Sequence, residues 1–152
     1  MEKKNIDWEN IGFGYIPTDK RFVANYKDGA WDEGGLTEDP NIVMNECAGV
    51  LQYAQTVFEG LKAYTTEDGH VVCFRPDLNA ERLEQSAQRL EMPAFPKDRF
   101  VDAIVQTVKA NIDYVPPYGS GATLYIRPYM FGTNAVIGVK PADEYQLSLI
   151  HI

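Results

Sequence analysis

The chain has 152 residues, of which 45% are hydrophobic and 12% aromatic, a composition that excludes a disordered protein. Its 14 Lys and Arg against 22 Asp and Glu give a formal net charge of −8, which argues against nucleic acid or an anionic membrane as partner. No apolar run approaches the roughly 18 residues that a membrane helix needs. The cysteines, Cys47 and Cys73, form no CxxC pair, and we expect reduced thiols in a cytoplasmic protein.

Two β-hairpins are predicted in the first half of the chain. Residues 21–36 alternate larger apolar side chains with polar or smaller ones around Asp28-Gly29, which is a strong turn signal. Residues 61–66 and 70–74 are strand-like on either side of a Glu-Asp-Gly turn. The segment from Tyr53 to Gly60 has no clear periodicity, and core packing is the simpler interpretation of it.

Two helices and two strands are predicted in the second half. Residues 79–90 carry apolar side chains on one helical face, with Asn79 as the N-cap. Residues 98–114 repeat large apolar side chains every four residues, and two prolines end that helix. Strands are predicted at 122–129 and 144–150. Strands at both ends around two adjacent helices predict an α+β fold, with the helices packed on an antiparallel or mixed sheet.

Arg82 is the first candidate for a binding site. It falls in the first turn of its predicted helix, where a cation opposes the helix dipole, and no acidic residue stands three or four positions away. An arginine placed there can bind an anion together with the free N–H groups of the helix start. The alternative is a solvated arginine or one paired in tertiary structure, and spacing alone favours this alternative.

The segment Thr123–Tyr129 is the second candidate. In a strand, Tyr125, Arg127 and Tyr129 share one face, while the intervening apolar residues face the core. Two phenols and a guanidinium can bind a carboxylate while packing on an apolar ligand. A solvent-facing side with tyrosine and arginine stacked on each other is an equally good interpretation. Pro128 indicates a sheet edge or a strand end.

Four motifs in order resemble a known family. They are Phe58-Glu-Gly-Leu-Lys-Ala-Tyr64, Phe74-Arg-Pro-Asp-Leu-Asn-Ala-Glu-Arg82, Ser86-Ala-Gln-Arg-Leu90 and Leu124-Tyr-Ile-Arg-Pro128. Together they resemble the branched-chain amino-acid aminotransferases, which are class IV (fold-type IV) pyridoxal-phosphate enzymes. The resemblance implies that residues 1–146 form the small N-terminal domain of such a D-amino-acid aminotransferase-like enzyme.

The resemblance also implies a substrate site and a partner. Phe13, Tyr53 and Phe58 resemble residues of the substrate pocket. Tyr125 and Arg127 resemble the pair that closes this pocket and engages the distal carboxylate of glutamate. The implied reaction transfers the amino group of leucine, isoleucine or valine to 2-oxoglutarate. Part of this set reaches the neighbouring active site in the family, so a homodimer is implied.

The implied cofactor of the whole enzyme is pyridoxal 5'-phosphate. Arg82, in its Asn-x-x-Arg motif, resembles the arginine that holds the cofactor phosphate. The Schiff-base lysine of the family lies in the C-terminal large domain, and none of the eight lysines here stands in that motif. Lys62 matches a lysine of the family that does not form the Schiff base. The resemblance therefore assigns no catalytic residue to this chain and implies that the chain alone is inactive.

The last six residues, Leu147–Ile152, do not resemble the continuation that the family has after Tyr145. They resemble an in-frame reading of a transposon mosaic-end adapter used in sequencing libraries, and our hypothesis is that this doubtful tail is a sequencing artefact.

Two alternatives for the function stay open. One is another class IV enzyme, such as a D-amino-acid aminotransferase or an aminodeoxychorismate lyase, and the other is a non-catalytic interaction module.

Overall fold

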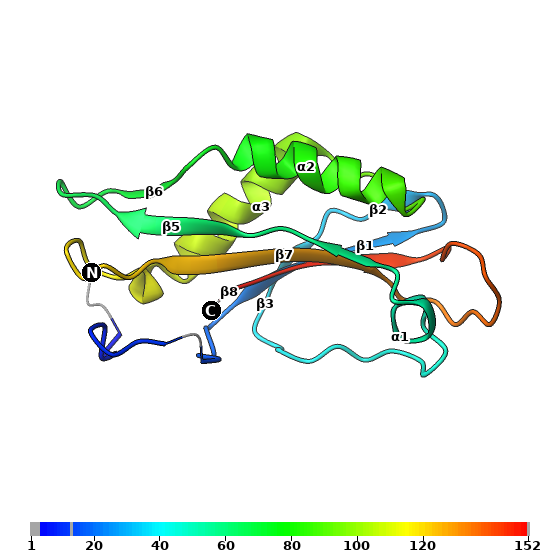
Figure 1. The fold of residues 1–152 in the computed structure, drawn as a ribbon, viewed down its shortest axis with the longest axis horizontal. Helices are drawn as coiled ribbons and strands as arrows, with labels where there is room; N and C mark the ends of the chain where they lie inside the picture. Colours follow the sequence, from blue (N-terminus) through cyan, green and yellow to red (C-terminus); the bar gives the residue numbers. More distant parts are fainter. Residues whose placement is uncertain (1–3, 13, 152) are drawn as a thin grey trace.

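The computed structural model describes residues 4–12 and 14–151, and it places two helices on one face of a twisted sheet (Figure 1). The strands are β1 (Arg21–Lys27), β2 (Ala30–Trp31), β3 (Gly35–Thr37), β4 (Thr56–Phe58), β5 (Leu61–Thr65), β6 (Val71–Cys73), β7 (Leu124–Gly132) and β8 (Tyr145–His151). The helices are α1 (Gly49–Tyr53), α2 (Pro76–Arg89) and α3 (Lys97–Ala110), followed by the 3-10 turn η1 (Ile112–Tyr114). The predicted α+β fold is confirmed.

The sheet has the order β2-β1-β8-β7-β5-β6, with β3 added to β1 and β4 added to β7. Every described pairing is antiparallel. Strand β8 lies between β1 and β7, so the segment from Leu147 onward, which the sequence marks as doubtful, fills the middle of the sheet. An apolar run of any origin can pair in that place, and the adapter hypothesis therefore stays a prediction.

The core lies between the sheet and helices α2 and α3. Along β7, Leu124, Ile126 and Met130 are buried toward the helices, and the fully buried Phe100 and Ile104 of α3 belong to the same cluster. This alternation leaves the opposite face of β7 free of α2 and α3. No helix within residues 4–12 and 14–151 is long and apolar enough to cross a membrane.

Both predicted hairpins are present. Asp28 and Gly29 have φ values of 52° and 83°, the two positive angles of a type I′ turn, and they join β1 to β2. Strands β5 and β6 pair across the second predicted turn, where Gly69 also has a positive φ of 84°. These turns are encoded locally, which explains why the sequence pattern locates them.

Two details differ from the prediction. Helix α2 begins at Pro76, because proline suits the first helical position, where no N–H is needed, and Arg75 before it is left-handed (φ 47°). Asn79 is therefore not the N-cap but lies inside the first turn. Pro128 is not at a sheet edge, because β7 is flanked on both sides. It faces the gap between β4 and β5, where the ladder is already interrupted and the Glu59 N–H donates to the Pro128 carbonyl (2.8 Å).

Candidate functional site

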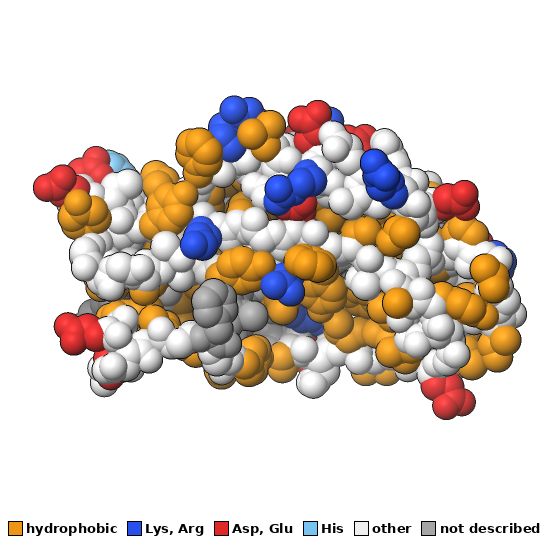
Figure 2. Space-filling view, viewed as in Figure 1, with side chains coloured by type: hydrophobic (Ala, Val, Ile, Leu, Met, Phe, Trp, Pro, Cys, Tyr) orange, Lys and Arg blue, Asp and Glu red, His pale blue; other side chains and the backbone are white. Residues whose placement is uncertain are grey.

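Three of the candidate site residues, Phe58, Tyr125 and Arg127, lie on the sheet face that α2 and α3 leave uncovered. Lys62 of β5 pairs with Tyr125 of β7, and Phe58 of β4 pairs with Tyr129, so these side chains share that face with Arg127. Figure 2 shows lysine and arginine side chains spread over the region of α2, β5 and β7, while most acidic side chains in this view lie near its rim. This region suits an anionic ligand although the chain carries a net charge of −8.

Arg127 sits between two aromatic side chains. Its Nε and Nη2 donate to the Tyr125 hydroxyl at 3.1 and 3.0 Å. Its guanidinium carbon lies 4.5 Å from the centre of the Phe58 ring and 5.3 Å from that of Tyr125. Arginine and tyrosine are thus stacked, as one of the two sequence interpretations expected. The remaining guanidinium N–H groups still allow a carboxylate to bind between the aromatic walls.

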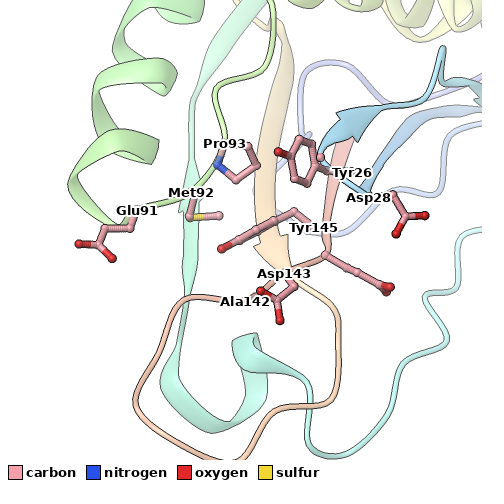
Figure 3. Close-up of a pocket in the computed structure, with 10 residues that line it drawn as sticks. Tyr26, Asp28, Glu91, Met92, Pro93, Ala142, Asp143 and Tyr145 are labelled. Atoms are coloured by element: carbon pink, nitrogen blue, oxygen red, sulfur yellow. The ribbon is translucent and has the colours of Figure 1, made fainter.

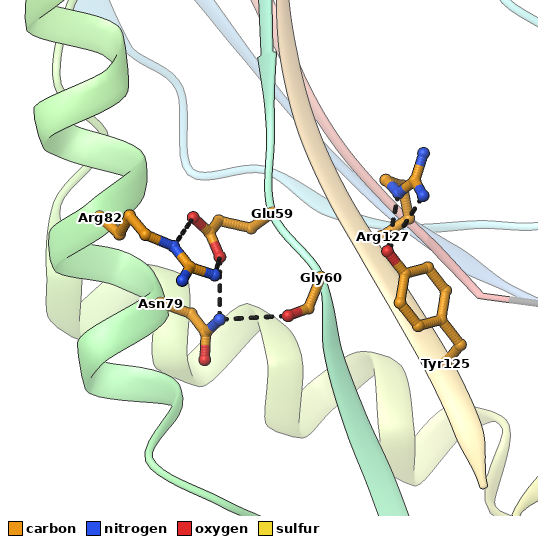
Figure 4. A network of polar contacts seen from close by, with 6 residues as sticks. All are labelled: Glu59, Gly60, Asn79, Arg82, Tyr125 and Arg127. Carbon is orange, nitrogen blue, oxygen red and sulfur yellow. Dashed lines mark hydrogen bonds and ion pairs between the residues drawn. The ribbon is translucent and has the colours of Figure 1, made fainter.

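Gly60 makes room for the Tyr125 hydroxyl. A Cβ atom built on Gly60 would lie 2.5 Å from the Tyr125 Oη, closer than real Cβ contacts allow. The glycine is therefore needed for a close approach between the start of β5 and the Tyr125 side chain. Figure 4 shows Gly60, just before β5, between the Tyr125–Arg127 pair and helix α2.

Arg82 forms a bidentate ion pair, as the alternative of an arginine paired in tertiary structure expected, but the sequence did not identify the partner. Its Nε and Nη2 donate to the two carboxylate oxygens of Glu59 at 2.8 and 2.7 Å, and Asn79 Nδ2 donates to the same carboxylate at 2.8 Å (Figure 4). The Glu59 side chain is 2% exposed, whereas that of Arg82 is 65% exposed. The partner lies 23 residues away, so helical spacing could not find it. A lone acid inside the apolar segment Val57–Ala63 was the available signal.

The placement of Arg82 changes how it can bind an anion. It is the seventh residue of α2, so it lies beyond the first turn that supplies free N–H groups, and that part of the prediction was wrong. The hydrogen bonds that it donates to Glu59 raise the pKa of the Arg82 guanidinium above its usual value. Arg82 is therefore a permanently charged side chain that depends on the ion pair for its orientation.

Tyr53 does not lie with this cluster. Tyr53 ends α1, and its hydroxyl accepts a hydrogen bond from the Gly138 N–H (2.7 Å) beside a cavity of about 410 Å³. No ring contact or hydrogen bond joins Tyr53 to the Arg127 cluster among the described residues. Phe13 lies outside the described residues. The structure thus brings together three of the five predicted substrate residues: Phe58, Tyr125 and Arg127.

A separate cavity of about 550 Å³ lies near the far end of α2 (Figure 3). Its lining includes four carboxylates around the rings of Tyr26 and Tyr145, and these acids are Asp28, Glu91, Asp143 and Glu144. Its lining includes none of the substrate or cofactor residues that the sequence predicts. Its negative charge disfavours a phosphate or a carboxylate ligand, so it is a poor place for the predicted chemistry.

Comparison with known proteins shows which proteins the chain is similar to. No family model matches it. It is 52% identical over 146 residues to the branched-chain-amino-acid aminotransferase of Haemophilus influenzae, covering 96% of this chain and 43% of that protein. The chain is similar to the N-terminal region of that branched-chain-amino-acid aminotransferase. The enzyme of Helicobacter pylori is 46% identical over 142 residues, which are 93% of this chain and 42% of that enzyme.

Solved branched-chain aminotransferases have the same fold. The Escherichia coli enzyme matches 89% of this chain and 40% of its own, with a TM-score of 0.68 at 21% identity. The Thermoproteus uzoniensis enzyme, solved with norvaline, also matches 89% of this chain and 40% of its own, with a TM-score of 0.67 at 24% identity. The chain thus spans about two fifths of the branched-chain aminotransferases that it matches.

Proposed function

We propose that this chain is the N-terminal domain of an aminotransferase that moves the amino group of leucine, isoleucine or valine to 2-oxoglutarate. The observation that carries the proposal is the 52% identity over 146 residues to a branched-chain-amino-acid aminotransferase. The geometry supports it, because one sheet face carries a cationic side chain between aromatic walls, and a second exposed guanidinium lies on the adjacent helix.

We propose pyridoxal 5'-phosphate as the cofactor of the whole enzyme. Another solved branched-chain aminotransferase of the same fold is complexed with N-(5'-phosphopyridoxyl)-L-glutamate. The donors of Arg82 fit a phosphate, since Glu59 takes up one edge of the guanidinium and the other edge has no partner among the described residues. When bound, pyridoxal phosphate supplies the electron sink for amino transfer. The role of Arg82 is to hold the phosphate end in place.

Arg127, Tyr125 and Phe58 together suit two kinds of substrate. Arg127 and the Tyr125 hydroxyl bind the distal carboxylate of glutamate or 2-oxoglutarate. When the substrate is a branched aliphatic amino acid, the guanidinium stays stacked on Phe58, and the aromatic rings present an apolar wall. This displaceable contact lets one site accept a carboxylate and an apolar side chain in turn.

Two further proposals concern what the chain does not supply. Its lysines match no Schiff-base motif, so that lysine comes from a part of the enzyme outside this chain, and the chain alone does not catalyse transamination. We further propose that the whole enzyme is a homodimer, in which part of the substrate set reaches the neighbouring active site. We also propose a cytoplasmic location, which the free thiols of Cys47 and Cys73 support.

The test is an assay of the full-length protein with matched amino donors. We expect amino transfer from leucine to 2-oxoglutarate at a rate far above that from D-alanine, and no transfer by residues 1–152 alone. A preference for D-alanine would indicate a D-amino-acid aminotransferase. Absence of any transamination by the full-length protein would favour the interaction module. A stoichiometric borohydride-reduced adduct on one lysine of the isolated chain, with activity, would refute its proposed inactivity.

A further inference from the structure

We propose that Glu59 is a positioning residue, which fixes the Arg82 guanidinium so that its free edge faces the cofactor phosphate. The inference rests on the proposed function, because it takes Arg82 as the phosphate ligand. It assigns a role to a buried carboxylate that the sequence analysis left without one.

Glu59 is held firmly enough to orient another side chain. It is 3% exposed, and its backbone N–H donates to the Pro128 carbonyl of β7 at 2.8 Å. Its carboxylate accepts hydrogen bonds from Asn79 at 2.8 Å and from two nitrogens of Arg82. Asn79 also donates to the Gly60 carbonyl at 3.3 Å. Main chain and side chain of Glu59 are therefore both tied to structured elements.

The two hydrogen bonds from Arg82 fix the plane of its guanidinium. An arginine side chain that is 65% exposed would otherwise sample many rotamers. Because Nε and Nη2 both face Glu59, the plane and the rotation of the group are set together. Nη1 and the second hydrogen of Nη2 then form the adjacent free edge, whose two parallel N–H directions match a pair of phosphate oxygens.

Helix α2 and the start of β5 are joined at this point. Asn79 and Arg82 stand three residues apart on α2, so both reach Glu59 from one helix face (Figure 4). Glu59 also lies between Phe58, which stacks on Arg127, and Gly60, which makes room for Tyr125. The ion pair therefore joins the phosphate ligand on α2 to the segment Phe58–Gly60, which also contacts Arg127 and Tyr125.

A purely structural ion pair gives a different result from a positioning one. If the pair only stabilises the fold, removing the Glu59 charge lowers the melting temperature and leaves ligand selectivity unchanged. If it orients Arg82, the same change weakens ligands that carry a phosphate more than ligands that lack it. Pyridoxal 5'-phosphate and pyridoxal differ by that group, so comparing their affinities separates the two cases.

The experiment measures the dissociation constants of pyridoxal 5'-phosphate and pyridoxal for the full-length protein by absorbance titration. We expect Glu59→Gln to weaken pyridoxal 5'-phosphate about tenfold, equivalent to about 1.4 kcal/mol, and to leave pyridoxal within about twofold. Glu84→Gln is the matched control. Glu84 lies on α2, as Arg82 does, and the substitution removes an ion pair with Lys97 (3.0 Å). It should change neither constant.

A second variant and a double mutant complete the test. Asn79→Ala leaves the carboxylate in place and should give a smaller loss with the same selectivity, which keeps the test valid if Glu59→Gln does not fold. In an Arg82→Met background, Glu59→Gln should have no further effect on the affinity for pyridoxal 5'-phosphate. Equal losses for both ligands, or none, would overturn the inference. Failure of the wild-type protein to bind pyridoxal 5'-phosphate would instead overturn the proposed function.

Discussion

Replacing Gly60 by alanine should disturb the site through Tyr125. The new Cβ would lie 2.5 Å from the Tyr125 Oη and 3.1 and 3.2 Å from Cζ and Cε2 of the ring. Gly60 is not among the glycines with positive φ, so alanine meets no backbone strain there. Since carbon and oxygen atoms pack at roughly 3.5 Å, the hydroxyl must retreat by about 1 Å. That shift changes the geometry of the 3.0 and 3.1 Å hydrogen bonds that the hydroxyl accepts from Arg127.

We expect Gly60→Ala to lower the free energy of unfolding by about 1–3 kcal/mol, the usual cost of overpacking. At about 2–4 °C per kcal/mol, the melting temperature should fall by roughly 2–12 °C. Gly35→Ala is the matched control, because that strand glycine has no atom within 4 Å of its built Cβ. Tyr125→Phe in the Gly60→Ala background removes the closest atom and should restore part of the loss. Equal stability of the two glycine variants, or no recovery in the double variant, would refute this reasoning.

Three further changes probe the site and the fold. Arg127→Met in the full-length protein should raise the KM for 2-oxoglutarate about tenfold or more and that for leucine less than about threefold, because only the former loses a charge-assisted hydrogen bond; equal increases would contradict this. Asn111 is buried and pairs with both the N–H and the carbonyl of Lys20 at 3.0 and 2.8 Å. Asn111→Ala should therefore cost about 2–4 kcal/mol in urea unfolding, and a loss below about 1 kcal/mol would count against that role. The hydrogen bond from Tyr114 lowers the pKa of Asp19 from its usual 3.8. The ionised Asp19 carboxylate thus adds to the stability of the fold above the pKa that Asp19 has in the unfolded chain. This stabilisation is lost as pH falls through the lower pKa of Asp19 in the folded protein. Asp19→Asn should be less stable than wild type by up to about 1 kcal/mol at about pH 6, and equally stable in acid below that folded pKa; an unchanged difference in acid would be the contrary result.

Local signals explain the parts of the fold that the sequence located. Asp28-Gly29 dictates its turn through two positive φ angles, and the four-residue repeat within 98–114 makes α3 recognisable. The end of that helix was overestimated, because α3 stops at Ala110 and the chain continues as the tighter η1 turn. Apolar spacing persists through Ile112 in either helix type, so periodicity alone could not mark the change.

Long-range pairing explains what the sequence could not locate. Pro128 resembles an edge residue by itself, and only the gap between β4 and β5 makes it acceptable inside the sheet. Glu59 and Arg82 are distant in sequence, and their ion pair follows from the packing of α2 against β4. The face shared by Tyr125 and Arg127 was predictable, since strand alternation is a local property. The contact between this face and Phe58 depends on the order of the strands and was therefore not predictable.

The most direct test of the account is a crystal structure of the full-length protein with pyridoxal 5'-phosphate. We expect the phosphate oxygens within about 3.2 Å of the Arg82 Nη1–Nη2 edge, with Glu59 still bound to the Nε–Nη2 edge. A phosphate held by other residues, with the Arg82 guanidinium turned away from it, would contradict the role that we give to this domain.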